Sequence, residues 1–398
     1  MERWQVSHSK LLWLTLGAFS IGTEGFMIAG LLPDLARDLN VGLPAAGHLV
    51  TAFSFAYALG APVIAVLTAS FERRSLLVVA MLCFGFGNAL AAVSPNYIGL
   101  LMARLVLALS AAGFMPAASG YAARLGGHER RGRALSIVTN GLTLAIIAGV
   151  PLGVLIGEWL GWRATFASVA GLSALSLIGI LSGMSRQPPG AVSTLGERFA
   201  LAKRPDILAV LATSVLTVAS TFTLYTYLSA FLAEAAGIGP SGLVMVLLAF
   251  GIASALGAWV GGVMTDRLGA AFTVTTGCSL TLLAYLMLSF APILARRDAA
   301  FAILPALLLW GLASWGAMTG QQARLVTLSP DMASVSLSLN SSAIYLGSAT
   351  GAATGALFVA EGAVVRLGVV AAFFCLGSLL ALWIAHKLSS RTKVGETS

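Results

Sequence analysis

Apolar residues run along the chain in stretches of roughly 20, each followed by a short polar break. A helical stretch of that length crosses about 30 Å of hydrocarbon. Unpaired backbone groups are costly in lipid, and these stretches are too long and continuous for barrel strands. The pattern therefore predicts an all-α integral membrane protein with twelve transmembrane helices, at residues 10–32, 48–69, 76–94, 97–124, 134–160, 163–184, 206–233, 242–265, 272–294, 299–322, 334–360 and 363–387.

Composition and charge agree with a membrane protein. Hydrophobic residues make up 58% of the 398 positions and charged residues only 10%, far from the usual soluble range. Of the 23 lysine and arginine residues, 17 fall on one side of the predicted membrane. Because cytoplasmic loops carry such an excess, both termini are predicted to be cytoplasmic. The net charge of +8 is dispersed over many loops, so no nucleic-acid partner is expected.

The longest internal polar stretch, SRQPPGAVSTLGERFALAKRPD, divides six predicted helices from six. It predicts an N-terminal six-helix half at 1–184, a cytoplasmic linker at 185–205 and a C-terminal six-helix half with a short cytoplasmic tail at 206–398. An offset of about 198 residues aligns the two halves. The alignment indicates an internal duplication, with the halves related by pseudo-two-fold symmetry.

Small residues recur every four positions in the fifth and eleventh predicted helices. The fifth has Gly141, Ala145, Gly149, Gly153 and Gly157, and the eleventh has Ala343, Gly347, Gly351 and Gly355. This spacing lines one helix face and allows a neighbouring backbone to come close. Ordinary tight packing accounts for part of the pattern, and its recurrence predicts a rocking interface between the two halves.

The loop after the eighth predicted helix carries the pattern G-x-x-x-D-R-x-G, with Gly262, Asp266, Arg267 and Gly269. Here the chain resembles the major facilitator superfamily, which has this signature between its second and third spans. An Asp beside Arg and Gly at a helix end can form and release charge-assisted bonds. We interpret these residues as a cytoplasmic gate, with a plain topological anchor as the alternative.

The loop after the second predicted helix is a degraded copy of that signature, within IAVLTASFERRSLL. Thr68 stands where the acid is expected and Ile64 where the glycine is expected. Of its basic end, Arg73 and Arg74 are left, and they are assigned to the gate with less support than Asp266.

The fifth predicted helix contains GVPLGVLIGEWLGWRATF, which resembles the Gly-Pro motif of antiporters in the superfamily. Gly149, Pro151, Gly153 and Gly157 are in register with it, and Gly141 extends the face. Val150 departs from the pattern, because many members have Gly directly before Pro. Proline in a membrane helix kinks it and frees a carbonyl. Exporters carry this motif and importers usually lack it, so the resemblance implies efflux.

Further matches extend the resemblance over most of the chain: GLLPDLARDL, ARLVLALSAAGF and GQQARLVTLSP. Together they are similar to the bacterial twelve-span drug/proton antiporters, near the sugar, purine and arabinose efflux members. The resemblance implies a monomer in the bacterial inner membrane that exports a small organic solute by proton antiport and alternating access. Its expected partners are that solute, protons and membrane lipid, and no metal or other cofactor is expected.

Glu24 is the one acid placed well inside a predicted span, where a carboxylate costs about 2.5–3.5 kcal/mol. It lies eight residues before Leu32, about 12 Å below the outer face. Arg104 lies seven residues after Tyr97, about 10 Å below the same face. Burial favours the neutral carboxylate and a nearby Arg104 the charged one, so the two are predicted to couple proton movement to transport. The alternative is a permanent ion pair that ties the first and fourth spans together.

Glu24 aligns with Phe222 in the seventh predicted helix, so the charge falls in one half and the aromatics in the other. Aromatic and neutral polar residues there are predicted to line a central cavity and to bind a planar or amphipathic solute. The main candidates are Phe222, Tyr225, Gln321, Asn340 and Tyr345. For any one aromatic side chain, packing in the core or against lipid is the alternative.

Enzyme, channel and uptake functions are the alternatives to export. The four histidines fall at span ends, in loops or near termini, and no Ser/His/Asp set, metal cluster or phosphate loop is evident, so catalysis is not expected. Channels usually build filters from symmetric rings, whereas a two-fold repeat with a kinked interface favours alternating access. Proton-independent uniport, or uptake by a symporter of the same fold, stays open because uniport would not require a titrating Glu24.

Overall fold

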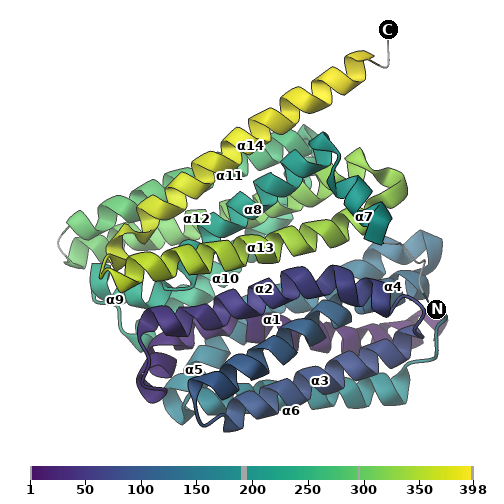
Figure 1. Ribbon diagram of the computed structural model, residues 1–398, viewed down its shortest axis with the longest axis horizontal. Helices are drawn as coiled ribbons and strands as arrows, with labels where there is room; N and C mark the ends of the chain where they lie inside the picture. Colours follow the sequence, from purple (N-terminus) through teal and green to yellow (C-terminus); the bar gives the residue numbers. More distant parts are fainter. Residues whose placement is uncertain (1, 190–194, 295, 396–398) are drawn as a thin grey trace. The chain divides into compact units, whose positions relative to one another are not determined.

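The computed structural model describes residues 2–189, 195–294 and 296–395. Across these ranges the chain folds into helices without a strand (Figure 1). Twelve of the described helical segments are long and apolar enough to cross a membrane. The predicted fold class and number of spans are therefore confirmed.

The chain divides into two compact units. Unit 1 comprises Met1–Val41 and Leu59–Ser193, and unit 2 comprises Gly42–Ala58 and Thr194–Ser398. The first part of the second span thus groups with unit 2. Within the predicted linker at 185–205, residues 190–194 lie outside the described residues.

Unit 1 is built around α1, which packs against α4, α5 and α6, while α3 packs against α4 and α6. The helix bounds are α1 Glu2–Asp38, α2 Leu43–Leu67, α3 Arg73–Val93, α4 Tyr97–Leu144, the π-helical turn η1 Ala145–Gly149, α5 Val150–Leu160 and α6 Trp162–Gly183. Gly127 interrupts α4 with φ 60°, a backbone angle that glycine adopts without strain. The fourth span ends at Gly127 and the fifth begins at Arg130.

Unit 2 has α8 packed against α13 and α14, and α12 packed against α10 and α11. The helix bounds are α7 Leu195–Ala202, α8 Pro205–Tyr225, α9 Leu228–Ala236, α10 Pro240–Leu268, α11 Ala270–Phe290, η2 Ala291–Ile293, α12 Arg296–Leu328, η3 Pro330–Met332, α13 Ala333–Ala360, η4 Val364–Arg366 and α14 Leu367–Gly395. Gly269, between α10 and α11, has φ 90°, so the last glycine of the G-x-x-x-D-R-x-G pattern occupies a turn where an L side chain would be strained.

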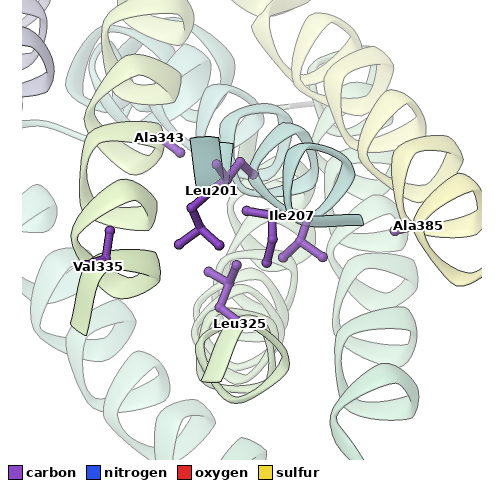
Figure 2. Packing of buried hydrophobic residues seen from close by; sticks show 8 residues of the cluster. Leu201, Ile207, Leu325, Val335, Ala343 and Ala385 are labelled. Carbon is purple, nitrogen blue, oxygen red and sulfur yellow. The ribbon is translucent and has the colours of Figure 1, made fainter. Parts of the chain in front are cut away.

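The short helix α7 is attached to unit 2 by a buried hydrophobic cluster (Figure 2). Leu201 packs there with Ile207 of α8, Leu325 of α12 and Val335 of α13. Taking a leucine side chain out of water contributes about 1.5–3 kcal/mol. An isolated helix of 8 residues is not stable in water, so α7 depends on tertiary contacts such as this one.

Candidate functional site

Glu24 on α1 and Arg104 on α4 form an ion pair inside unit 1, in which Arg104 Nη1 donates to Glu24 Oε1. Both residues are completely buried, with 0% exposure. The helix-rise argument placed them at one depth, and the packing of α1 on α4 brings their side chains together. Two opposite charges therefore lie in contact in the interior of unit 1, removed from water.

The second carboxylate oxygen of Glu24, Oε2, is buried and has no hydrogen-bond partner in the described part of the chain. The hydroxyl of the adjacent Thr23 is likewise buried without a hydrogen-bond partner there. A buried acceptor without a donor carries a penalty of about 1–3 kcal/mol. Glu24 therefore keeps an acceptor oxygen that a proton can occupy without breaking the bond to Arg104.

The glycine face of the fifth span packs against α1 of the same unit. A side-chain carbon added at Gly141 would collide with the Thr15 backbone oxygen, one at Gly149 with the Thr23 hydroxyl, and one at Gly157 with Leu31. At Gly153 it would lie 3.1 Å from Met27 Sδ. The prediction that this face forms an interface between the two halves is therefore wrong for these four glycines, because a stripe of small residues fits any helix that comes close.

Unit 2 repeats this arrangement with α13 on α8. Side-chain carbons added at Gly347 and Gly351 would collide with the backbone of α8 at Val215 and Ala219. The glycine face of the eleventh span thus also serves packing inside its own unit. The two units share one device, a glycine-bearing helix closely packed on the first span of the unit.

Pro151 is the second residue of α5, which follows the π-helical turn η1 directly. Val150 N–H there donates to Ala145 O, a bond across five residues, and π turns of this kind occur mostly as single-turn bulges near functional sites. The Thr165 hydroxyl of α6 donates to Gly153 O at 2.9 Å. The antiporter-like motif therefore sits at a local change of helix winding that a neighbouring helix supports.

The two copies of the loop signature differ. Asp266 and Arg267 are exposed in the last turn of α10, and in the part of the chain that the structure describes Asp266 makes no ion pair. An added side-chain carbon at Gly262 would meet open space. The gate assigned to Asp266 remains a prediction.

In the loop of the first copy, the signature position is Thr68, and the acid that makes contacts is Glu72, which sequence reasoning did not single out. Glu72 caps α3 by accepting the N–H groups of Arg74 at 2.9 Å and Ser75 at 3.1 Å, and it also accepts the Gln187 N–H at 2.8 Å. Partial burial raises the pKa of Glu72, but these bonds and that from the Ser75 hydroxyl outweigh it and lower the pKa to about 2. The carboxylate is therefore charged at any physiological pH.

The predicted cavity residues make three different sets of contacts in unit 2. Phe222 and Tyr225 lie in an aromatic group, with Tyr225 6.4 Å from Trp310 between ring centroids. Tyr345 instead stacks on Tyr57, with ring centroids 3.6 Å apart.

Gln321 and Asn340 line a small cavity together with Ser214 and Thr217. Its volume open to water-sized spheres is about 20 Å³, room for about one water molecule. Gln321 Nε2 donates to Val210 O at 2.6 Å, and Asn340 Oδ1 accepts from the Ser214 hydroxyl at 2.7 Å. These amides thus hold α8, α12 and α13 together, and their role in solute binding stays a prediction.

Close backbone contact in unit 2 also occurs between α10 and α12, which the sequence analysis did not predict. Side-chain carbons added at Gly257 and Gly261 of α10 would collide with the backbone of α12 at Leu312 and Gly316. The two glycines have the same four-residue spacing as those of the fifth span, so this close contact could have been predicted from the sequence.

Comparison with known proteins identifies the fold family. A family model described as the Major Facilitator Superfamily matches residues 14–352. The chain belongs to this superfamily. The resemblance seen in the loop signature and the span-five motif is thereby confirmed at the level of the superfamily.

Bacterial transporters of the superfamily are similar over most of the chain. An uncharacterized MFS-type transporter of Bacillus subtilis, YbcL, is 35% identical over 350 residues, 88% of each chain. The inner membrane transport protein YdhP of Escherichia coli K12 is 34% identical, over 88% of this chain and 89% of its own. The chloramphenicol resistance protein of Streptomyces lividans is 36% identical, over 67% of this chain and 69% of its own. The chain is therefore a multi-pass membrane transporter of the superfamily.

A solved superfamily structure shows the same fold. It is a crystal structure of a bacterial homolog of the human lysosomal transporter Spinster, in an inward-facing and occupied conformation. The TM-score is 0.77, over 95% of this chain and 96% of that one, with 16% sequence identity. At this identity the likeness concerns the fold alone.

Proposed function

We propose that this transporter exports a small organic solute across the bacterial inner membrane in exchange for protons, and that Glu24 carries the proton. The observation that carries the proposal is the fully buried ion pair of Glu24 and Arg104. A carboxylate inside a span is costly, so such residues are rare and usually serve a function. Its open oxygen, Oε2, provides a place for a proton.

In the proposed cycle a proton entering from outside neutralises Glu24 and weakens its attraction to Arg104. The neutral side chain passes more easily through a dry, occluded state than the charged one. Solute binding from the cytoplasm then favours release of the proton, because the two compete for one site. The exposed Asp266 at the end of α10 is assigned to the gate that changes between these states.

Two features support the direction and the class of solute. The sequence motif around Pro151 resembles that of exporters, and one similar protein is named a chloramphenicol resistance protein. The aromatic and neutral amide groups of unit 2 suit an uncharged or cationic organic solute better than an anionic one. Proton-independent uniport, or uptake by a symporter of the same fold, is the alternative.

The test is gradient-driven accumulation in inside-out vesicles that contain the purified protein, with labelled chloramphenicol as the first solute of a panel. Glu24→Gln should abolish accumulation driven by a pH gradient and leave downhill exchange largely intact. Glu234→Gln, a change at an exposed acid of α9, is the matched control and should pump normally. A Glu24→Gln protein that still pumps uphill with undiminished proton coupling would show that the carboxylate is structural. Transport by the unaltered protein that ignores the pH gradient would indicate uniport.

A further inference from the structure

The segment that follows α6, Met184–Pro189, is bound to the rest of unit 1 through its backbone; we call this segment the strap. Gln187 is held on both sides. Its N–H donates to Glu72 Oε1 at 2.8 Å, and its carbonyl accepts the Arg73 N–H at 3.2 Å. The α2–α3 loop and the strap therefore share a closed pair of hydrogen bonds.

Further donors from unit 1 hold the carbonyls on either side of Gln187. The Tyr121 hydroxyl donates to Ser185 O at 3.1 Å, and Arg124 Nη1 donates to Pro188 O at 2.7 Å. Both donors belong to the end of the fourth span. The Tyr121 hydroxyl also lies 3.5 Å from the Ser185 hydroxyl. The other contacts are with the strap backbone, so binding depends mainly on backbone groups of the strap.

The identity of residue 72 points to a purpose beyond helix capping. Ser, Thr, Asp, Asn and Gly are the residues preferred at an N-cap, and Glu is not among them. A shorter side chain would satisfy the Arg74 and Ser75 N–H groups. The extra length of Glu72 is what allows the same carboxylate to reach the Gln187 N–H as well.

The chain beyond the strap is soon anchored again, to unit 2. Leu201 of α7 lies in the hydrophobic cluster of that unit, and Arg198 Nη1 donates to the Ser338 hydroxyl of α13 at 2.9 Å. From Pro189 to Leu195 there are six residue steps. An extended chain covers about 3.3–3.6 Å per residue, so the two anchored ends can be at most about 20 Å apart.

We propose that the α2–α3 loop and the end of the fourth span form a docking surface for the strap, and that the docked strap keeps the tether between the units short. Releasing residues 184–189 adds five residue steps and nearly doubles the reach of the tether. A short tether limits how far the two ends of the linker separate when the transporter opens on the side where the linker lies, which is predicted to be cytoplasmic. The mechanical role rests on the proposed alternating access, whereas docking of the strap does not.

Amide hydrogen exchange of the full-length protein tests the docking. The strap reports few sites, because Pro188 and Pro189 have no amide hydrogen. Glu72→Ser keeps a good N-cap for α3 and cannot reach Gln187, and Gln187→Pro removes the donated N–H without touching Glu72. Glu72→Ser should speed exchange at the Gln187 amide about tenfold to a hundredfold, the effect of losing a hydrogen bond to a charged group. Under Gln187→Pro, the Arg73 amide should exchange faster.

Asp331→Ser is the control, since it alters an exposed acid of η3 in unit 2, and exchange in the strap should not change. Docking is wrong if the Gln187 amide of the unaltered protein exchanges at the rate of an unstructured peptide. It is equally wrong if Glu72→Ser leaves that rate as it was.

The tether is tested by electron–electron resonance between spin labels at the exposed positions Ser182 and Ala200, in a protein without its native cysteines. Glu72→Ser should extend the distance distribution to longer values, and Asp331→Ser should not. Faster exchange without longer distances would refute the tether and retain the docking. Neither measurement involves solute or protons, so failure here is distinguishable from failure of the antiport proposal.

Discussion

The two units of the transporter use the same backbone packing around different interiors. In each, a glycine-bearing helix packs closely on the first span, as Gly141 does on α1 and Gly351 on α8. Unit 1 then buries the charges of Glu24 and Arg104, whereas unit 2 has Phe222 at the aligned position, beside the ring of Tyr225. The difference teaches that close helix packing builds the scaffold, and that single side chains decide whether an aligned position is charged or neutral.

The loop that matches the sequence signature better is not the loop that forms more hydrogen bonds. Asp266 of unit 2 retains the expected pattern and is exposed, while Glu72 of unit 1 lies in the degraded copy and accepts several hydrogen bonds. Departure from the pattern thus does not leave this loop without polar contacts. In unit 1 the loop binds Gln187, at the start of the linker.

The largest expected effect comes from breaking the charge pair that distinguishes unit 1. Arg104→Leu leaves the Glu24 carboxylate buried without its partner, and this should cost about 3–5 kcal/mol of stability. The double change Glu24→Leu with Arg104→Leu should recover most of that loss, because no buried charge is then left without its partner. Thermal unfolding of the purified protein in detergent measures both. If the double variant is as unstable as the single one, the pair supports the scaffold itself.

A smaller effect compares equivalent glycines of the two units. The carbon added by Gly351→Ala would collide with the backbone of α8, which cannot rotate away, and about 1–3 kcal/mol should be lost. For Gly153→Ala the neighbours are side-chain atoms at longer distances, Met27 Sδ at 3.1 Å, Met27 Cβ at 3.2 Å and Thr165 Cγ2 at 3.3 Å. The loss should therefore be smaller than at Gly351, about 1 kcal/mol. Gly262→Ala, which meets open space, is the control. Equal losses at Gly351 and Gly153 would contradict the close backbone contact in unit 2.

The smallest expected effect on stability is at the exposed loop acid of unit 2. Asp266→Asn should change the unfolding free energy by no more than about 0.5 kcal/mol, as for other surface positions without partners. As a gate residue it should nevertheless slow turnover more than it weakens solute binding. Equilibrium binding and single-turnover transport, measured on the same preparation, separate the two. Weaker binding with normal turnover of bound solute would remove Asp266 from the gate.

The sequence alone determined the number of spans, their helical form and the depth of the key charges. Hydrocarbon forces each crossing segment to satisfy its own backbone, so an apolar stretch of sufficient length admits one answer. A helix rises by a constant 1.5 Å per residue, and Glu24 and Arg104 could therefore be placed at one level before any packing was known. The loop glycine Gly269 was likewise readable, because its turn needs a backbone angle that other residues resist.

Tertiary structure decided which surfaces meet. The spacing of Gly149 and Gly153 required a close neighbour and could not say that the neighbour is α1, since small residues accept any approaching backbone. The five residues predicted to line one cavity make three separate sets of contacts. An aromatic ring or an amide is compatible with many partners, so its sequence position does not say which partner it meets. Glu72 shows the limit most clearly. Its bond to Gln187 joins positions 115 residues apart, and no local pattern contains that information, because it arises only when the end of α6 is folded back against the start of α3.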